Sequence, residues 1–161
     1  MNIQTRDYQT AAVRSLYDYF ENRTGNPVIA MPTGTGKSVV IAEFLRSIYT
    51  AYPHQRVIVA THVKELIAQN YEKLRIVWPH APAGIYSAGL GRRDNMQRIT
   101  FAGIASISKK AALFGHIDLL IIDEAHLVSP AEETMYRGFI NALKTAKIGR
   151  ASCRERVYSS V

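Results

Sequence analysis

The stretch that decides the fold reads Thr33-Gly34-Thr35-Gly36-Lys37-Ser38. It stands between a short apolar run at 28–30 and an amphipathic segment that begins near Lys37. Glycines in such a turn let backbone N–H groups point inward around an anion, and the N-terminus of the following helix adds partial positive charge. A lysine here can reach the outer phosphates of a nucleotide, and the Ser38 hydroxyl can bind magnesium. The stretch therefore predicts a phosphate-binding loop.

This loop departs from the strict phosphate-loop pattern at one position. The pattern has a glycine five residues before Gly36, and the chain has Met31 there. A glycine-rich turn that carries a surface lysine is the alternative interpretation. The setting between a strand and a helix favours phosphate binding, because that is the context in which the pattern works.

Two adjacent carboxylates, Asp123 and Glu124, follow the apolar run at 119–122. In an open α/β sheet, ligands bind at the carboxyl ends of the strands, so we expect this pair at the same edge as the phosphate loop. Asp123 can hold magnesium, and Glu124 can polarise the water that attacks a phosphate. Acidic residues also cap helices at strand-to-helix turns. The phosphate loop upstream favours the nucleotide site over a helix cap.

Elsewhere, short apolar runs alternate with amphipathic stretches, which is typical of βαβ units around a mostly parallel sheet. The pattern predicts one α/β domain. A basic loop at 89–98 is expected between two short strands. The predicted helices cover 6–22, a segment that includes 40–48, 63–77 and 130–146, and the predicted strands are 28–30, 57–60, 85–86, 99–101 and 119–122.

Composition narrows the class of protein. The chain has 161 residues, of which 47% are hydrophobic and 20% are charged, and its formal net charge is +7. A single cysteine, Cys153, excludes an internal disulfide. No apolar run approaches the roughly 18 residues of a membrane span, so we expect a cytoplasmic protein without a membrane partner. The positive charge favours nucleic acid as a partner, although ordinary surface lysine and arginine would also account for it.

With both motifs placed, the chain resembles the first RecA-like ATPase lobe of superfamily-two nucleic-acid helicases and translocases. Residues 30–38 resemble motif I, in which the first glycine is often replaced. Asp123-Glu124-Ala125-His126 is the DEAH form of motif II, and Arg6-Asp7-Tyr8-Gln9 resembles the adenine-reading Q motif. Residues 61–69 resemble motif Ia, and 101–107 fall where the next strand-gripping motif belongs. Within the superfamily, the stretches 62–66 and 87–90 resemble the RadD-like group of bacterial DNA-repair helicases.

The resemblance implies a RecA-like P-loop fold with ATP and Mg²⁺ as cofactors. The phosphates would lie in the loop, magnesium would bind two residues, and a carboxylate would act as general base. Gln9 would read the adenine edge, and Arg6 would pack nearby. The remaining implied roles fall on Thr33, Gly34, Thr35, Gly36 and Lys37 for the phosphates, Ser38 and Asp123 for magnesium, Glu124 for the base, and His126 as a relay between nucleotide and strand.

The same resemblance implies contacts with nucleic acid. Lys64 in motif Ia and Ser106 in the next motif would grip the backbone of the strand. Arg92 and Arg93 either grip phosphates or solvate the basic loop. Two positions depart from the family: motif Ia lacks the usual proline-threonine pair, and Ala105 replaces a polar residue beside Ser106.

We expect the lobe to occupy residues 1–147 and to be incomplete. Relatives continue with a motif III strand and a second RecA-like lobe that supplies an arginine finger, and neither pattern follows here. Residues 148–161 look non-native, and 148–157 resemble the translated read-through of a sequencing-library adapter; a genuinely encoded basic tail is the alternative. This tail holds three arginines and one glutamate, so residues 1–147 carry +5.

The missing motif III strand would lie between the phosphate-loop strand and the acidic-box strand. Its absence leads to one of three arrangements: an unpaired slot, a direct and distorted pairing of the two strands, or a strand improvised from the tail around 156–158. In each case, buried backbone groups need new partners.

The function expected from these patterns is that of an ATP-driven motor on nucleic acid, with DNA favoured. Mg-ATP hydrolysis belongs to the full-length protein, and the fragment alone is expected to be poorly active. Three alternatives stay open: an RNA helicase, a restriction-type DNA translocase subunit, and a truncated nucleotide-binding fragment without turnover. The DEAH box does not discriminate between the first two, and the intact Lys37, Asp123 and Glu124 indicate that the parent gene encodes an active enzyme.

Overall fold

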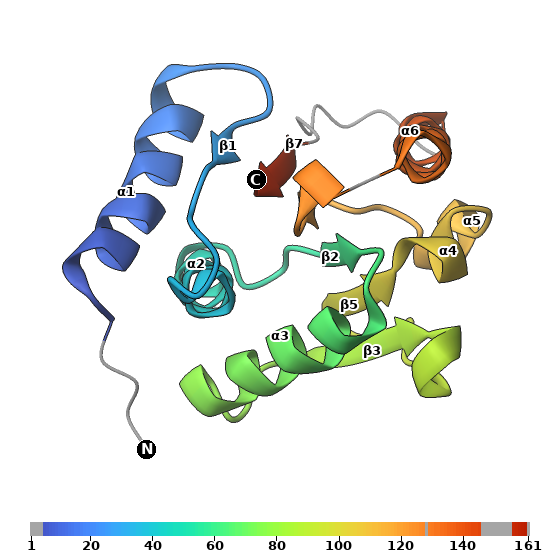
Figure 1. Cartoon of the computed structure of the whole chain (residues 1–161), viewed down its shortest axis with the longest axis horizontal. Coiled ribbons are helices and arrows are strands. Elements are labelled where there is room, and N and C mark those ends of the chain that lie inside the picture. Colours follow the sequence, from blue (N-terminus) through green and yellow to red (C-terminus); the bar gives the residue numbers. More distant parts are fainter. Residues whose placement is uncertain (1–4, 128, 146–155, 161) are drawn as a thin grey trace.

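Helices cover both faces of a mostly parallel sheet in the computed structural model, which describes residues 5–127, 129–145 and 156–160 (Figure 1). The sheet has seven strands in the order β1-β7-β6-β2-β5-β3-β4. Every neighbouring pair is parallel except β3 with β4. The predicted α/β fold is therefore confirmed. No helix of the described part is long and apolar enough to cross a membrane.

The element boundaries agree with the sequence pattern for the longer elements. The strands are β1 (Val28–Ile29), β2 (Val57–Thr61), β3 (Ala83–Ser87), β4 (Arg92–Arg93), β5 (Ile99–Gly103), β6 (Leu119–Ile122) and β7 (Arg156–Ser160). The α-helices are α1 (Asp7–Asn22), α2 (Lys37–Ala51), α3 (Lys64–Val77), α4 (Ile104–Ile107), α5 (Ala111–Phe114) and α6 (Pro130–Thr145). Two 3₁₀ turns, η1 (Ala88–Leu90) and η2 (Ala125–Leu127), complete the list.

Several short elements were not predicted. Helices α4 and α5 have four residues each, which is too short for a helical period to be visible in the sequence. The predicted basic loop at 89–98 is wrong in part, because it contains the end of η1 and strand β4. β4 pairs antiparallel with β3, so this segment turns back along the sheet.

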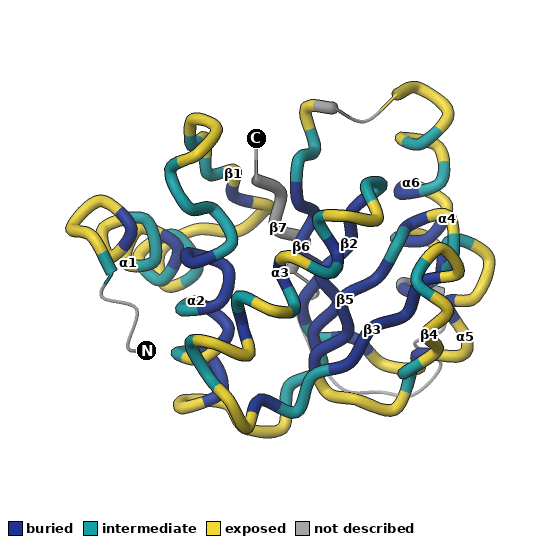
Figure 2. Tube along the Cα trace, turned by 60° about the horizontal axis from the view of Figure 1, so that its bottom comes forward, coloured by how far each residue is buried: buried dark blue, intermediate teal, exposed yellow. Residues whose placement is uncertain are grey.

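Alternating residues of the central strands divide the core into two layers. In β2, Val57 and Val59 pack with α1, α2 and α3, whereas Ile58 and Ala60 pack with α4, α5 and α6. This alternation follows from the pleat of a strand, in which successive side chains point to opposite faces. Strands β2, β3, β5 and β6 are buried on both faces (Figure 2), which explains why the longer of them appear in the sequence as continuous apolar runs.

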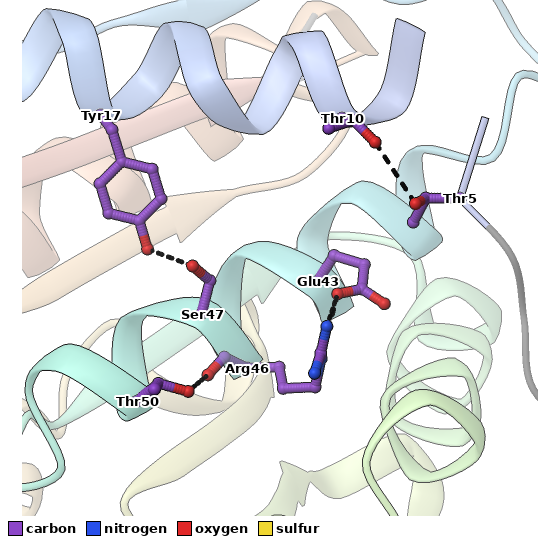
Figure 3. A network of polar contacts seen from close by, with 7 residues as sticks. All are labelled: Thr5, Thr10, Tyr17, Glu43, Arg46, Ser47 and Thr50. Carbon is purple, nitrogen blue, oxygen red and sulfur yellow. Dashed lines mark hydrogen bonds and ion pairs between the residues drawn. The ribbon is translucent and has the colours of Figure 1, made fainter. Parts of the chain in front are cut away.

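Helix α1 is held against α2 by aromatic packing and one polar contact. Phe20 stacks on Phe44, and Tyr17 meets the same ring edge-on. The Tyr17 hydroxyl also donates to Ser47 Oγ at 2.8 Å (Figure 3). These contacts fix α1 beside the helix that follows the phosphate loop.

Strand β7 fills the position between β1 and β6. Its backbone pairs in parallel with both neighbours, with Tyr158 opposite Ile121 and Ser159 opposite Val28. Of the three expected arrangements, the strand formed from 156–160 is the one confirmed. Residues 146–155 lie outside the described residues, and the expected lobe boundary at 147 falls among them.

Replacing Tyr158 by proline tests whether this strand supports the sheet. Proline has no backbone N–H, so Tyr158→Pro removes a ladder hydrogen bond within a central strand. We expect the free energy of unfolding to fall by about 1–3 kcal/mol, the cost of one unpaired buried group. Urea unfolding would measure it. Tyr158→Val is the control, because it also loses the ring but keeps the N–H; equal unfolding midpoints for the two variants would contradict a supporting role.

Candidate functional site

The phosphate loop connects β1 to α2 and has the backbone shape that its glycines allow. Gly34 and Gly36 have φ values of 79° and 82°, in the left-handed region that side chains disfavour. Gly36 caps α2, and its carbonyl accepts hydrogen bonds from the amides of Val39 and Val40. The loop therefore delivers Lys37 and Ser38 in the first turn of a helix, where backbone N–H groups without an intrahelical partner favour anions.

Glu124 is the residue on which the predicted catalytic side chains converge. Lys37 Nζ lies 2.6 Å from Glu124 Oε1, and both side chains are largely shielded from solvent. On the other side, His126 Nδ1 lies 3.3 Å from Glu124 Oε2, and this contact is an ion pair only when the imidazole is protonated. The two halves of the candidate site thus meet through one carboxylate.

The two adjacent carboxylates point to different partners. Asp123 is buried, and its Oδ2 accepts a hydrogen bond of 2.7 Å from Asn70 Nδ2 of α3. Glu124 has φ of 55°, the one positive value among the described non-glycine residues. A side chain in the left-handed region costs about 1–2 kcal/mol. This turn directs Glu124 toward Lys37 while Asp123 stays against α3.

The Q-motif residues lie against the phosphate loop. The Gln9 amide forms one hydrogen bond at each end there: its Oε1 accepts from the Arg6 backbone N–H, and its Nε2 donates to the Thr35 carbonyl, both at 3.0 Å. The Tyr8 hydroxyl donates to the same carbonyl at 2.9 Å and accepts from Arg6 Nη1. Sequence reasoning missed this contact of Tyr8, because a tyrosine at a helix start carries no distinctive pattern. A pocket of about 480 Å³ opens beside Tyr8, and Met31 lines it.

The predicted nucleic-acid residues Lys64 and Ser106 lie on either side of η1. Ser106 Oγ accepts a 2.9 Å hydrogen bond from the Ala88 amide. Lys64 is exposed at the start of α3, forms a loose ion pair with Glu65, and passes beside Gly89. Both residues therefore belong to one surface, at the carboxyl ends of β2, β3 and β5.

Arg92 and Arg93, adjacent in β4, have different environments. Arg92 pairs with Asp94 at 2.6 Å and lies over the Tyr71 ring. A hydrogen bond from the Ile85 amide and this arginine lower the pKa of the Asp94 carboxyl.

Arg93 instead lies over Tyr86, a buried ring that Lys110 also approaches, with Nζ 3.3 Å from the hydroxyl. In the described part of the chain, neither Arg93 nor Lys110 forms an ion pair with a carboxylate. Sequence reasoning missed Lys110, because only the fold brings it to Arg93.

Comparison with known proteins identifies the family. Residues 2–149 match the type III restriction enzyme res subunit family. The chain belongs to this family. The sequence matches no individual curated protein.

Solved structures share the fold at low sequence identity. The Sulfolobus solfataricus SWI2/SNF2 ATPase core in complex with dsDNA is 13% identical with a TM-score of 0.76, over 100% of this chain and 32% of that one. The UvsW helicase from bacteriophage T4 is 19% identical with a TM-score of 0.69, over 98% and 52%. The type ISP restriction-modification enzyme LlaGI, a nuclease-deletion mutant bound to a DNA substrate mimic, is 14% identical with a TM-score of 0.64, over 98% and 17%. This res-family chain thus has the fold of a RecA-like lobe and spans about half or less of these proteins.

Two alanine substitutions separate backbone strain from the contact with Gln9. Gly34→Ala should cost about 1–2 kcal/mol of stability from the left-handed backbone alone, because nothing lies within 4 Å of an added Cβ. Gly36→Ala should cost more, because its Cβ would come within 2.6 Å of Gln9 Nε2, whose amide is held by two hydrogen bonds. Urea unfolding of both variants would show the difference. Equal losses of stability in the two variants would mean that the Gln9 side chain moves aside without cost and does not stabilise the loop.

Proposed function

We propose that the chain is the first motor lobe of an ATP-driven DNA helicase or translocase of the DEAH-box type. The observation that carries the proposal is the 2.6 Å contact between Lys37 Nζ and Glu124 Oε1, two residues 87 positions apart in the sequence. A phosphate-loop lysine that faces an acidic-box carboxylate is an arrangement suited to phosphoryl transfer, which depends on positioning and charge neutralisation. Membership of the restriction-enzyme family supports a DNA motor.

The residues of the site fit a magnesium nucleotide. The left-handed glycines and the first turn of α2 form a cradle of backbone N–H groups, and Lys37 already holds an anionic partner in Glu124. Residues Thr33 to Gly36 would surround the phosphates, and Gln9 with Arg6 would face the adenine. Ser38 and Asp123 supply the oxygen atoms that magnesium prefers. Bound magnesium would neutralise charge on the phosphates.

Nucleotide binding would release Glu124 for its chemical role. Phosphate oxygens would replace the Glu124 carboxylate as the partner of Lys37, because they offer the same ammonium group more negative charge. Glu124 would then accept a hydrogen bond from the attacking water and take its proton, as the new P–O bond forms and the bond to the ADP oxygen breaks. His126 contacts the same carboxylate and is half exposed. It is therefore placed to couple contact with the nucleic-acid strand to the general base, Glu124.

The longer protein is part of this proposal. A second RecA-like lobe would supply an arginine finger for the transition state. Within the superfamily, the DEAH sequence at 123–126 and the stretches 62–66 and 87–90 favour a relative of the RadD-like DNA-repair helicases.

Two substitutions at the Lys37–Glu124 contact should separate binding from turnover in the full-length protein. Glu124→Gln keeps the shape of the side chain and should keep ATP binding, but it should lower hydrolysis about 10²- to 10⁴-fold, the usual contribution of a general base. Lys37→Ala should abolish ATP binding, because it removes the cation that faces the phosphates. Calorimetry and phosphate release would measure the two effects. Hydrolysis by Glu124→Gln within about twofold of the wild type would remove Glu124 from the role of base.

DNA would bind across the carboxyl ends of the strands. Lys64 and Ser106 lie beside η1 there, and Arg93 with Lys110 forms a cationic pair over Tyr86. Arg92, with its charge satisfied by Asp94, is the weaker candidate of the two arginines. The SWI2/SNF2 core and LlaGI, which share the fold, were solved with DNA or a DNA mimic.

Salt-dependent DNA binding tests this surface. Each phosphate contact contributes about 0.9 to the log–log slope of affinity against salt, so Arg93→Ala and Lys110→Ala should each lower the slope by roughly one. Arg92→Ala is the matched control because its guanidinium is already paired, and Arg14→Ala controls for net charge on exposed α1. Fluorescence anisotropy with a DNA duplex would measure the slopes. Equal losses in all four variants would indicate a general charge effect, and tighter binding of RNA would favour the RNA helicase.

A further inference from the structure

Asn70 connects α3 to the acidic box through a buried hydrogen bond. Its Nδ2 donates to Asp123 Oδ2 at 2.7 Å, and both side chains are shielded from water. Asp123 is also fixed through its backbone, because its N–H donates to the Ala60 carbonyl of β2 at 2.9 Å. The side-chain contact therefore sets the orientation of a carboxylate whose main chain is already held.

An amide suits this place better than a cation or an apolar group would. A lysine or arginine would orient Asp123 but would also neutralise its charge, which a metal ligand needs to keep. Leucine would fill the core but would leave the carboxylate without this donor. Asparagine donates one N–H and carries no charge, so Asp123 remains oriented and negative.

Burying Asn70 in the core has a cost in stability. Asn70 lies between Ile67 and Leu74 on the buried face of α3, and its Oδ1 is buried without a hydrogen-bond partner in the described part of the chain. A buried acceptor without a partner costs about 1–3 kcal/mol. An apolar residue at this helix position would avoid the cost, so packing alone does not account for an asparagine there.

We propose that Asn70 is a positioning residue that orients Asp123 for magnesium. The inference rests on the proposed nucleotide site and adds to it a residue, Asn70, that holds the proposed metal ligand Asp123 in place. Partners of this kind hold a ligand in its binding orientation, and their loss typically lowers metal affinity about 10- to 100-fold.

Magnesium titration of nucleotide binding tests the proposal in the full-length protein. A fluorescent ATP analogue would be bound at a series of Mg²⁺ concentrations, with wild type, Asn70→Ala, Asn70→Leu and Asn22→Leu, which makes the same change at an exposed asparagine of α1. We expect both Asn70 variants to need about 10- to 100-fold more Mg²⁺ for half-maximal binding, with binding of the metal-free analogue unchanged. Asn22→Leu should titrate like the wild type.

Asn70→Leu distinguishes positioning from a purely structural role. It removes the unpaired acceptor but also takes the donor away from the buried Asp123 carboxylate, two effects of similar size and opposite sign. Its melting temperature should therefore stay near that of the wild type while its Mg²⁺ midpoint still rises. A midpoint within about twofold of the wild type in this folded variant would overturn the proposal. Failure of the wild-type chain to bind the analogue at all would instead overturn the proposed nucleotide site, so the two failures are distinguishable.

Discussion

Parallel pairing of the central strands is the constraint on which the candidate site depends. When neighbouring strands run in one direction, their carboxyl ends lie at the same edge of the sheet, and the segments that follow them meet there. β1 leads into the phosphate loop, β2 into the start of α3, and β6 into Asp123 and Glu124. Because side chains alternate along each strand, helices on both faces can pack without covering this edge. The Lys37–Glu124 contact is a product of that geometry.

Patterns that are local in the sequence could be predicted, and contacts that depend on the packing of distant segments could not. The glycine-rich turn before Lys37 and the apolar run before Asp123 are each recognisable within a few residues of sequence. Their positions in the fold could therefore be predicted without knowledge of any distant contact. Asn70 carried a weaker pattern, a polar residue on an apolar helix face, and its partner 53 residues away was not visible. The different environments of Arg92 and Arg93 depend on β4, a strand of two residues with no period to detect.

The position between β1 and β6 shows how a sheet can accept a strand with little regard to its sequence. Ladder hydrogen bonds join backbone groups, which nearly every residue carries, and an open edge presents a row of them. The segment 156–160 pairs with both neighbours in register, although its sequence has no resemblance to the motif III strand expected there. The backbone hydrogen bonds of the two flanking strands are therefore satisfied by this pairing. The side chains of a motif III strand are not replaced by it.

Under the proposed function, the position of β7 also ties nucleotide affinity to the integrity of the sheet. β1 ends directly at the phosphate loop, and among the described strands β7 is its one neighbour. A ligand that binds only when the loop is in place stabilises the arrangement that holds it, by about 2.7 kcal/mol at a concentration 100 times its dissociation constant. Opening of β7 and loss of the loop are then one thermodynamic event. Amide hydrogens of β1 and β7 would exchange with solvent together, and a bound nucleotide would slow both by the same factor.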